Sequence, residues 1–390
     1  MKCKVQKICG GCLGFSKSME TLCQQKQEIV QANMDKHHLK VNVHPVLKAK
    51  KQTQYRNKVI VGFSKEKGKV YSGLYAPKSH RVVHSEGCLM HPPLVNAIIQ
   101  TITELVHSMH IQLYNEKTRT GLLKHVLIRY AHNTEEVMVV FVTSQKIFPS
   151  RKNLIQAIVR KHPEVKTILQ NVNPRKTSIV LENETFPLYG NGTITDILGN
   201  QKITFGPSSF YQIHSWQCEE LYELGRKLLN PSKNDILLDT YCGVGTIGLS
   251  MARYCKKVYG VEINPDAIVN AKQNAKQNHV SNIQFIANDS TRFMTQAKRK
   301  RFYFDGIILD PPRAGTTVPF IKAACELNPK KILYISCDPT TFGRDLLEFK
   351  KQGYLTDDVY PVDMFPYTEH VETVCLLSKR DWLKPKKYKK

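Results

Sequence analysis

The chain holds a thiol and two carboxyl groups where predicted strands begin or end, and their spacing suggests chemistry. Cys337 directly follows the apolar run 331–336, which is typical of a strand buried on both faces. In open α/β sheets ligands bind outside the carboxyl ends of the strands, so a thiol there can act as a nucleophile. A lone cysteine is more often a packing residue, since free cysteine is among the most buried residue types. Its neighbours Asp310 and Glu372 must therefore decide between the two interpretations.

The elements that position these residues follow a strict strand–helix alternation after Asn234, which predicts a doubly wound, mostly parallel sheet and an α/β fold. The expected strands are 235–240, 257–263, 283–288, 304–310 and 331–336, followed by about 355–363 and 371–378. The expected helices are about 246–255, 265–278, 317–327 and 340–350.

A glycine-rich segment between the first strand and the first helix of this region predicts a nucleotide site. Gly243, Gly245 and Gly248 have the spacing of a dinucleotide fingerprint, and Glu262, about 20 residues on, can accept both ribose hydroxyls. This pattern makes an NAD(P)-dependent oxidoreductase one candidate. Asp239 opposes it, because a carboxylate just before the glycines would repel pyrophosphate. It suits instead the ammonium group and cationic centre of S-adenosylmethionine.

Two further strand ends favour S-adenosylmethionine. Asp289 follows the third strand, where it can accept a hydrogen bond from an adenine amino group. Asp310 begins the segment 310–313, Asp-Pro-Pro-Arg, which has no role in hydride transfer.

Composition limits the class of protein. The chain has 390 residues, with 57 Lys and Arg against 33 Asp and Glu, giving a net charge of +24. Such an excess favours a polyanionic partner such as nucleic acid. No apolar run approaches the roughly 18 residues of a membrane span, and the N-terminus lacks an apolar signal core. We therefore expect a cytoplasmic protein with reduced cysteines.

Four cysteines near the N-terminus are candidate metal ligands. Cys3, Cys9 and Cys12 cluster in the first dozen residues, and Cys88 lies in a polar loop that can supply the fourth thiolate. Spacing alone does not separate zinc from an iron–sulfur cluster, and unliganded thiols are the alternative.

The run 48–58 combines five positive charges with an aromatic residue and no acid. This composition suits phosphate contacts and base stacking, although a solvated loop has the same composition. The candidate RNA-binding residues are Lys50, Lys51, Tyr55, Arg56, Asn57 and Lys58. A second basic stretch, the tail 384–390, has five lysines and is another candidate for phosphate contact.

The thiol and carboxylates together fit one reaction. Carbon 5 of a pyrimidine is a poor nucleophile until a thiolate adds to C6, and a base must then remove the C5 proton. Cys337 and Glu372 can supply these two roles.

These residues resemble a known family. In the motifs 239–248, 309–315, 336–339 and 363–372 the chain is similar to the bacterial S-adenosylmethionine-dependent RNA uracil-C5 methyltransferases. The resemblance implies Cys337 as nucleophile and Glu372 as base. It also implies cofactor contacts from Gln212, Tyr241, Glu262, Asp289 and Asp310, and a 4Fe-4S cluster held by Cys3, Cys9, Cys12 and Cys88. The cluster is a feature of family members that act on 23S rRNA, which makes this RNA the expected substrate.

The resemblance also shows departures. Many members carry Asn in place of Asp338 and of His214, and many begin with a small RNA-binding barrel that we expect to be absent here. The sequence predicts a monomer of three segments: a cysteine cluster with a basic hairpin (1–90), a central α+β RNA-binding domain (91–205) and the methyltransferase domain (206–390). The alternatives are a tRNA uridine-C5 methyltransferase, an NAD(P)-dependent iron–sulfur oxidoreductase, and an RNA-binding protein with a degenerate methyltransferase domain.

The first 205 residues carry their own pattern of elements. Expected helices are 19–36, 92–110 and 150–161, and expected strands are a hairpin at 59–75 and runs at 124–131, 136–143, 166–171 and 177–182. A helix at 215–229 is expected to precede the alternating region.

Overall fold

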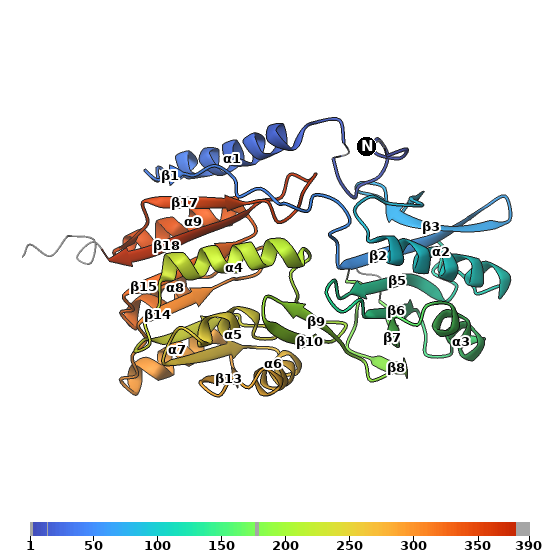
Figure 1. The fold of residues 1–390 in the computed structure, drawn as a ribbon. Coiled ribbons are helices and arrows are strands. Elements are labelled where there is room, and N and C mark those ends of the chain that lie inside the picture. The colour runs from blue at the N-terminus through green and yellow to red at the C-terminus, as the bar shows by residue number, and fades with distance from the viewer. Residues whose placement is uncertain (1–2, 14, 176–178, 380–390) are drawn as a thin grey trace, which may run out of the picture. The chain divides into compact units, whose positions relative to one another are not determined.

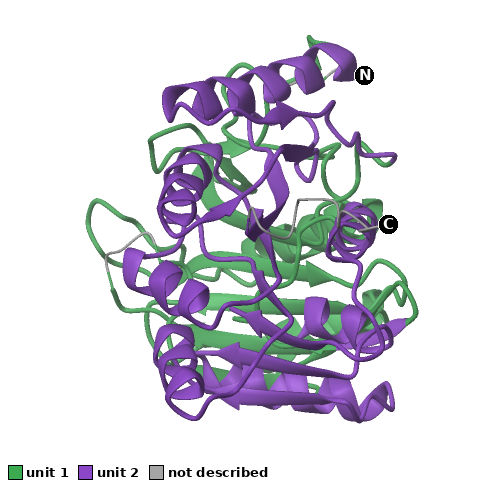
Figure 2. Ribbon diagram, turned by 90° about the vertical axis from the view of Figure 1, so that its left-hand side faces the viewer, with its two compact units in different colours: residues 1–17, 51–200, 204–215 green, residues 18–50, 201–203, 216–390 purple. Residues whose placement is uncertain are grey.

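The computed structural model describes residues 3–13, 15–175 and 179–379 (Figure 1). It divides into two compact units, coloured separately in Figure 2. The first unit contains residues 1–17, 51–200 and 204–215, and the second contains 18–50, 201–203 and 216–390. The basic tail 384–390 lies outside the described residues.

The second unit is built on a nine-stranded sheet of described residues, in the order β1-β17-β18-β15-β14-β11-β12-β13, with β16 beside β18. Neighbouring strands from β13 to β15 in this order are parallel, whereas β18 runs antiparallel between β15 and β17. The alternating strand–helix pattern is thus confirmed as a doubly wound sheet. The strands are β1 (Asn42–Val43), β11 (Ile236–Thr240), β12 (Lys257–Glu262), β13 (Ile283–Ala287), β14 (Gly306–Leu309), β15 (Lys331–Ser336), β16 (Tyr354–Leu355), β17 (Asp358–Val362) and β18 (Glu372–Lys379).

Helices cover both faces of this sheet. One continuous apolar core joins α1, α7, α8 and α9 to the strands, with Tyr334 and Phe342 among its fully buried side chains. On the opposite face α4 comes so close to β15 that a Cβ at Gly225 would lie 3.0 Å from Leu333. The helices are α1 (Met19–Lys36), α4 (Ser215–Leu229), α5 (Thr246–Ala252), α6 (Pro265–Gln277), α7 (Ser290–Arg299), α8 (Val318–Glu326) and α9 (Pro339–Lys351).

The sequence patterns did not predict α7. This helix is strongly polar, and only Met294 and Ala297 among its apolar residues are fully buried, so its apolar stripe is too short to recognise. Asp289 is its N-cap, with Oδ1 accepting from the Arg292 amide at 2.8 Å. Asp289, which is expected to contact adenine, therefore also uses one carboxylate oxygen to cap the start of α7.

The described residues of the first unit form a separate seven-stranded sheet, in the order β4-β3-β2-β5-β6-β7-β8. Apolar residues of α2 and α3, among them Ile98, Ile102 and Leu154, form a separate core with one face of it. The elements are β2 (Lys58–Glu66), β3 (Lys69–Tyr75), β4 (Val82–His84), α2 (Pro93–Ser108), β5 (Leu123–Tyr130), β6 (Val137–Thr143), α3 (Arg151–Lys161), β7 (Val165–Val172) and β8 (Thr185–Tyr189). The hairpin of β9 (Ile194–Leu198) and β10 (Gln201–Phe205) contains two of the five points at which the chain changes unit.

Two expectations about the N-terminal half are wrong. Segments 1–90 and 91–205 are not separate domains, because β2 pairs with β5 and Val59 lies opposite Ile128 in one sheet. The segment 18–50 belongs instead to the second unit, where β1 pairs with β17. The strand expected at 177–182 is not found in its described residues, 179–182, and the next strand is β8 at Thr185–Tyr189; residues 177 and 178 lie outside the described part of the chain.

Candidate active site

The carboxyl edge of the nine-stranded sheet collects the predicted site residues of the second unit. β11 pairs with both β12 and β14, so the strand order reverses at β11, where open α/β sheets bind ligands. β18 is antiparallel to β15, so its first residue lies at the edge where β15 ends. Around this edge lie Asp239, Tyr241, Gly243, Gly245, Glu262, Asp289, Asp310, Cys337 and Glu372.

The loop from β11 to α5 is shaped by close backbone approaches. Gly245 has φ +86°, and a Cβ there would lie 2.4 Å from the Phe285 ring. A Cβ at Gly248 would lie 2.9 Å from Asp239 Oδ2, which accepts a hydrogen bond from the Gly248 amide at 2.8 Å. The glycines therefore let the backbone fold tightly around the Asp239 carboxylate.

Asp239 leaves one oxygen for a ligand. The residue is 1% exposed, and Oδ1 is buried without a hydrogen-bond partner. Burial raises the pKa of Asp239 to about 8, against the opposing hydrogen bond from Gly248. A buried carboxylate oxygen without a donor costs free energy unless a ligand supplies one. An ammonium group of a bound cofactor fits this requirement.

Glu262 and Tyr241 are already oriented. Glu262 accepts hydrogen bonds from the Gly243 amide at 3.2 Å and from the Asn264 amide at 2.9 Å, which fixes its carboxylate at the end of β12. The hydroxyl groups of Tyr241 and Thr316 lie 3.1 Å apart. Gln212, the remaining predicted cofactor residue, belongs to the first unit and is 5% exposed.

Cys337 and Glu372 are brought together by the antiparallel pair β15–β18. Ser336 lies opposite Thr373, whose hydroxyl donates to the Ser336 carbonyl at 3.1 Å. Cys337 and Glu372 are the next residues on each strand, at the same edge. Asp310 follows β14, the parallel neighbour of β15. One thiol and two carboxyl groups thus share a small region.

The electrostatics of this region keep the thiol protonated. Burial, then Glu372 and then Asp310 raise the pKa of Cys337 to about 12, while Arg313 acts in the opposite direction. Burial, and then Asp310, raise the pKa of Glu372 well above its usual range. Glu372 is 2% exposed, and its Oε2 is buried without a hydrogen-bond partner. The second orphaned carboxyl oxygen of the site therefore lies beside the thiol.

Arg313 and Asp338 flank the thiol. Arg313 Nε donates to Asp338 Oδ2 at 3.2 Å, and Asp338 caps α9 through the Thr340 amide at 2.9 Å. Both residues act electrostatically on His370, in the connection between β17 and β18. A carboxylate at position 338 thus holds a cation close to Cys337.

The four N-terminal cysteines all belong to the first unit and are partly buried. Burial raises the pKa of Cys9 and of Cys88; Cys12 and Cys3 raise that of Cys9 further, and Cys12 and Cys9 raise that of Cys88. The thiols therefore lie within electrostatic reach of one another. Among the described residues, no group of three or more His, Cys, Asp or Glu side chains has the geometry to hold a metal ion.

The basic run divides between the units. Lys50 belongs to the second unit and forms an ion pair with Glu220 at 2.7 Å, while Lys51 and Lys58 belong to the first and are exposed. Arg56 donates to the Gly11 carbonyl at 2.5 Å. The run therefore does not form a single exposed strip.

Tyr55 and Asn57 were expected to contact RNA, but both side chains are buried. Tyr55 is 0% exposed and stacks on His214, with ring centroids 4.7 Å apart. Asn57 is 2% exposed and donates to the Gln212 carbonyl at 2.7 Å. Their polar and aromatic groups serve contacts within the first unit, which their sequence context did not reveal.

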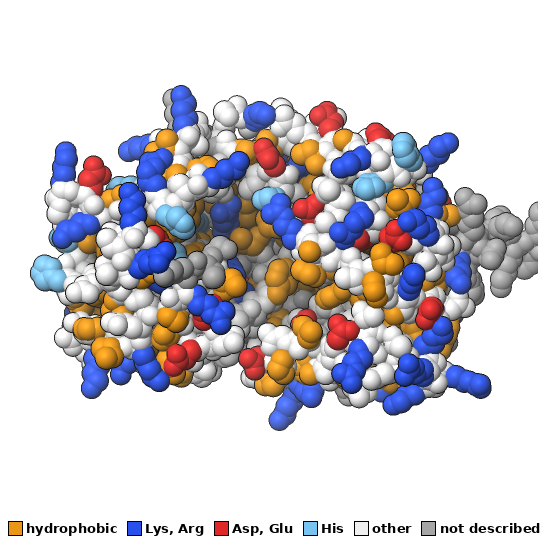
Figure 3. Space-filling model, turned by 180° about the vertical axis from the view of Figure 1, so that it is seen from behind, with side chains coloured by type: hydrophobic (Ala, Val, Ile, Leu, Met, Phe, Trp, Pro, Cys, Tyr) orange, Lys and Arg blue, Asp and Glu red, His pale blue; other side chains and the backbone are white. Residues whose placement is uncertain are grey.

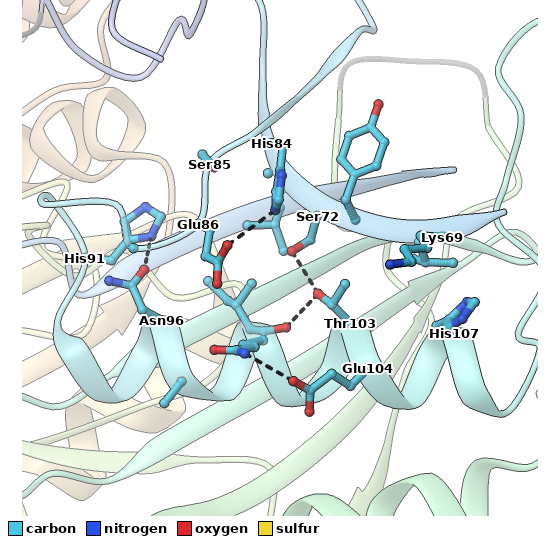
Figure 4. A pocket seen from close by; sticks show the side chains of 18 of the residues that line it. Lys69, Ser72, His84, Ser85, Glu86, His91, Asn96, Thr103, Glu104 and His107 are labelled. Carbon is cyan, nitrogen blue, oxygen red and sulfur yellow. Dashed lines mark hydrogen bonds and ion pairs between the residues drawn. The ribbon is translucent and has the colours of Figure 1, made fainter. Parts of the chain in front are cut away.

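A groove of about 1000 Å³ lies between the β2–β3 hairpin and α2 (Figure 4). His84 and Glu86 lie 3.9 Å apart on its wall, and Thr103 donates to Ser72 at 2.8 Å. Three glutamates and two lysines line it, so it lacks the positive charge that phosphate binding needs. None of the predicted site residues faces this groove.

The exposed side chains and the helices are consistent with a basic composition that lacks long apolar runs. Lys and Arg side chains are spread over the face shown in Figure 3. No helix in the described part of the chain is long and apolar enough to cross a membrane.

The fold and the carboxyl edge define an α/β methyltransferase that uses S-adenosylmethionine, and comparison with known proteins agrees. The model of the tRNA (uracil-5-)-methyltransferase family matches residues 18–380. The chain therefore belongs to this family of RNA methyltransferases. This membership excludes the NAD(P)-dependent oxidoreductase interpretation.

Individual relatives cover nearly the whole chain. An uncharacterized RNA methyltransferase of Oceanobacillus iheyensis is 38% identical over 373 residues, which are 95% of this chain and 81% of the relative. One from Clostridium tetani is 37% identical over 377 residues, or 96% and 82%. The solved structure of the Pyrococcus abyssi tRNA (uracil-54, C5)-methyltransferase with S-adenosyl-L-homocysteine has a TM-score of 0.75 and 26% identity. It covers 95% of this chain and 84% of that one.

Proposed function

We propose that the protein transfers a methyl group to C5 of a uridine in RNA, with Cys337 as nucleophile and Glu372 as base. The observation that carries this proposal is the juxtaposition of the two residues at adjacent ends of β15 and β18, beside Asp310. A thiol and a buried carboxyl group are the two groups that methylation at a pyrimidine C5 requires.

S-adenosylmethionine, when bound, supplies the electrophilic methyl group. Asp239, with its orphaned Oδ1, accepts from the ammonium group, and Glu262 accepts from the ribose hydroxyls. Tyr241, Gly243, Gly245, Asp289 and Asp310 complete the proposed cofactor contacts of the second unit, and the family resemblance assigns Gln212 to the cofactor as well. The orphaned oxygen supports this assignment most directly.

Cys337 and Glu372 carry out separate steps of the proposed reaction. The half-buried Cys337 thiol loses its proton to solvent, and the thiolate adds to C6 of a uracil turned out of its stack. The π electron pair of the C5–C6 bond moves to C5, which forms the new bond to the methyl carbon; the S–CH3 bond breaks, and its electron pair stays on the cofactor sulfur, which leaves as a neutral thioether. Glu372 removes the C5 proton, and the electrons of the broken C–H bond restore the double bond and expel the thiolate. The high pKa of Cys337 makes thiol ionisation the step that a higher pH accelerates.

The direct test is product analysis. Incubation with RNA and cofactor carrying a labelled methyl group, followed by digestion to nucleosides, should place the label in 5-methyluridine. Label in a different nucleoside would contradict the proposed reaction. Absence of label with both rRNA and tRNA would contradict activity on these substrates.

We further propose 23S rRNA as the substrate, which the four N-terminal cysteines support through the family resemblance. The relative from Pyrococcus abyssi, named for position 54 of tRNA, favours tRNA as the second candidate. Mass-spectrometric mapping of 5-methyluridine in rRNA and tRNA from cells with and without the gene separates the two. Loss of the modification from a tRNA only would overturn the rRNA assignment.

We also propose that Cys3, Cys9, Cys12 and Cys88 hold a 4Fe-4S cluster. Their electrostatic proximity and partial burial support it. Thiolate-ligated iron gives a brown protein, so anaerobic purification should yield iron and sulfide that Cys88→Ser removes. A colourless protein with bound zinc would overturn this proposal. We expect the protein to act as a monomer in the cytoplasm, which light scattering and cell fractionation test.

For RNA contact we propose the exposed lysines of the basic run. Lys51 and Lys58 are exposed in the first unit. Lys50 and Arg56 add positive charge, although Lys50 is paired with Glu220 and Arg56 donates to the Gly11 carbonyl. These side chains suit phosphate oxygens, which fix RNA without reading its sequence.

A further inference from the structure

α1 carries a lysine within its apolar face. Its buried residues are Met19, Leu22, Lys26, Val30 and Met34. Lys26 is 1% exposed, and lysine is almost never fully buried unless it is paired. The proposed mechanism does not use this cation, so its contacts must explain its burial. A lysine in the apolar stripe of an amphipathic helix is also the sequence signal that could have predicted a buried partner.

Lys26 holds the connection that follows β17. Its Nζ donates to Asp363 Oδ1 at 2.5 Å and to the Phe365 carbonyl at 3.0 Å. Asp363 is itself fully buried and directly follows Val362, which lies opposite Glu372 in the β17–β18 pair. Lys26 therefore binds the first residues of the connection, next to the β17 residue that pairs with the proposed base.

The same connection contains a strained turn. The Thr368 amide and hydroxyl both donate to the Phe365 carbonyl, at 3.1 and 2.8 Å. Tyr367, third in this turn, has φ +60°, a conformation that usually requires glycine. Such backbone persists only where its surroundings hold it, and Lys26 adds a donor to the carbonyl that closes the turn.

The hydrogen bonds continue toward the base. The His370 amide donates to Thr368 Oγ1 at 3.2 Å, two residues before Glu372. Arg313 and Asp338, which flank Cys337, act electrostatically on His370. The connection 363–371 therefore runs from Lys26 past the neighbours of the thiol to the start of β18.

We propose that Lys26 is a positioning residue for removal of the C5 proton: it holds the connection 363–371 so that Glu372 faces the substrate carbon. This inference rests on the proposed function. Cys337 follows β15, whereas the connection 363–371 joins β17 to β18. We therefore expect loss of Lys26 to affect proton removal by Glu372 much more than adduct formation and methyl transfer. A purely structural ion pair would instead affect every step alike.

Three variants separate these roles. Lys26→Met keeps the length of the side chain and removes its charge and donors, and Lys36→Met is the matched control at an exposed position of the same helix. Glu372→Gln is the reference for loss of the base. Each protein is assayed for turnover on uridine RNA, for covalent complex with that RNA, and for the rate of trapping by 5-fluorouridine RNA with the cofactor.

The expected result is a split between steps. Lys26→Met lowers turnover by about tenfold to a hundredfold, as misplaced catalytic groups do, and a covalent complex with ordinary uridine RNA accumulates, as in Glu372→Gln. Trapping by 5-fluorouridine RNA, which ends before proton removal, stays within about threefold of wild type. Lys36→Met changes none of the three, and Lys26→Arg, which keeps the donors, restores part of the turnover.

A parallel fall in turnover and trapping would overturn the positioning role. If Glu372→Gln itself gives no covalent complex with uridine RNA, the base assignment fails, and the role of Lys26 fails with it. Removing one partner of a buried ion pair can unfold a protein. If thermal unfolding shows this for Lys26→Met, the double variant Lys26→Met, Asp363→Asn removes both charges and is judged by the same split.

Discussion

At the carboxyl edge of the nine-stranded sheet, the order of the strands brings the acidic and thiol side chains together. Along residues 48–58, by contrast, the side chains differ in burial and have separate partners. Parallel strands end at a common edge, so Asp310 and Cys337 are neighbours because of strand order. In the basic run, Lys50 belongs to one unit, Tyr55 is buried in the other, and Lys58 is exposed. Residues at strand ends should therefore respond to substitution much more sharply than residues of the run.

The largest effect is expected at the proposed nucleophile. Cys337→Ser should lower methylation by at least about a thousandfold, because the hydroxyl is a much weaker nucleophile than the thiolate. Cys325→Ser, at a buried cysteine of the same unit, is the control and should keep activity. Comparable rates for the two variants, measured with labelled cofactor, would remove Cys337 from the mechanism.

Loss of the base should be nearly as severe but differ in kind. Glu372→Gln is expected to lower turnover by about a hundredfold to ten-thousandfold, the contribution typical of general base catalysis. The adduct still forms, so a denaturing gel should show protein covalently bound to uridine RNA. An inactive variant without this complex would mean that Glu372 acts before the methyl transfer.

A smaller, pH-dependent effect is expected at Asp239. Losing a hydrogen bond to a charged group should weaken cofactor binding by about tenfold to a hundredfold in Asp239→Asn. Burial raises the pKa of Asp239 from near 4 to about 8, so the cofactor-free protein holds an extra proton between these values. The contribution of Asp239 to the stability of the folded, cofactor-free protein therefore falls as the pH rises through that window. Cofactor binding, which favours the ionised carboxylate, should release a proton.

Calorimetry in buffers of different ionisation enthalpy measures that proton. Wild type should release close to one proton per cofactor near pH 7, and Asp239→Asn should release measurably less. Asp266→Asn, at an exposed position in the first turn of α6, is the control. Equal proton release by all three proteins would show that Asp239 does not ionise on binding.

The smallest effects are expected in the basic run. Lys51→Ala and Lys58→Ala should each weaken RNA binding roughly threefold and lower the slope of log affinity against log salt by about 0.7 to 0.9, the effect of one phosphate contact. Lys276→Ala, an exposed lysine of α6, serves as the control. A loss of a hundredfold at either position would mean that the run acts as a precise site, contrary to its dispersed contacts.

The alternating half of the chain was predictable because buried parallel strands are continuous apolar runs. β15 was predicted to the residue, and the glycine, acidic and thiol positions followed from the strand ends. The polar helix α7 gave too little apolar signal. The pairing of β2 with β5 and the burial of Lys26 against Asp363 join residues far apart in the sequence, and local periodicity does not reveal such contacts.

Covalent trapping tests the central claim most directly. With RNA containing 5-fluorouridine and S-adenosylmethionine, Cys337 should remain bonded to C6, because Glu372 cannot remove fluorine from C5 as it removes a proton. The account predicts a stable protein–RNA complex on a denaturing gel, carrying the transferred methyl group and absent in Cys337→Ser. No complex from active protein, or a complex that survives the loss of Cys337, would contradict it.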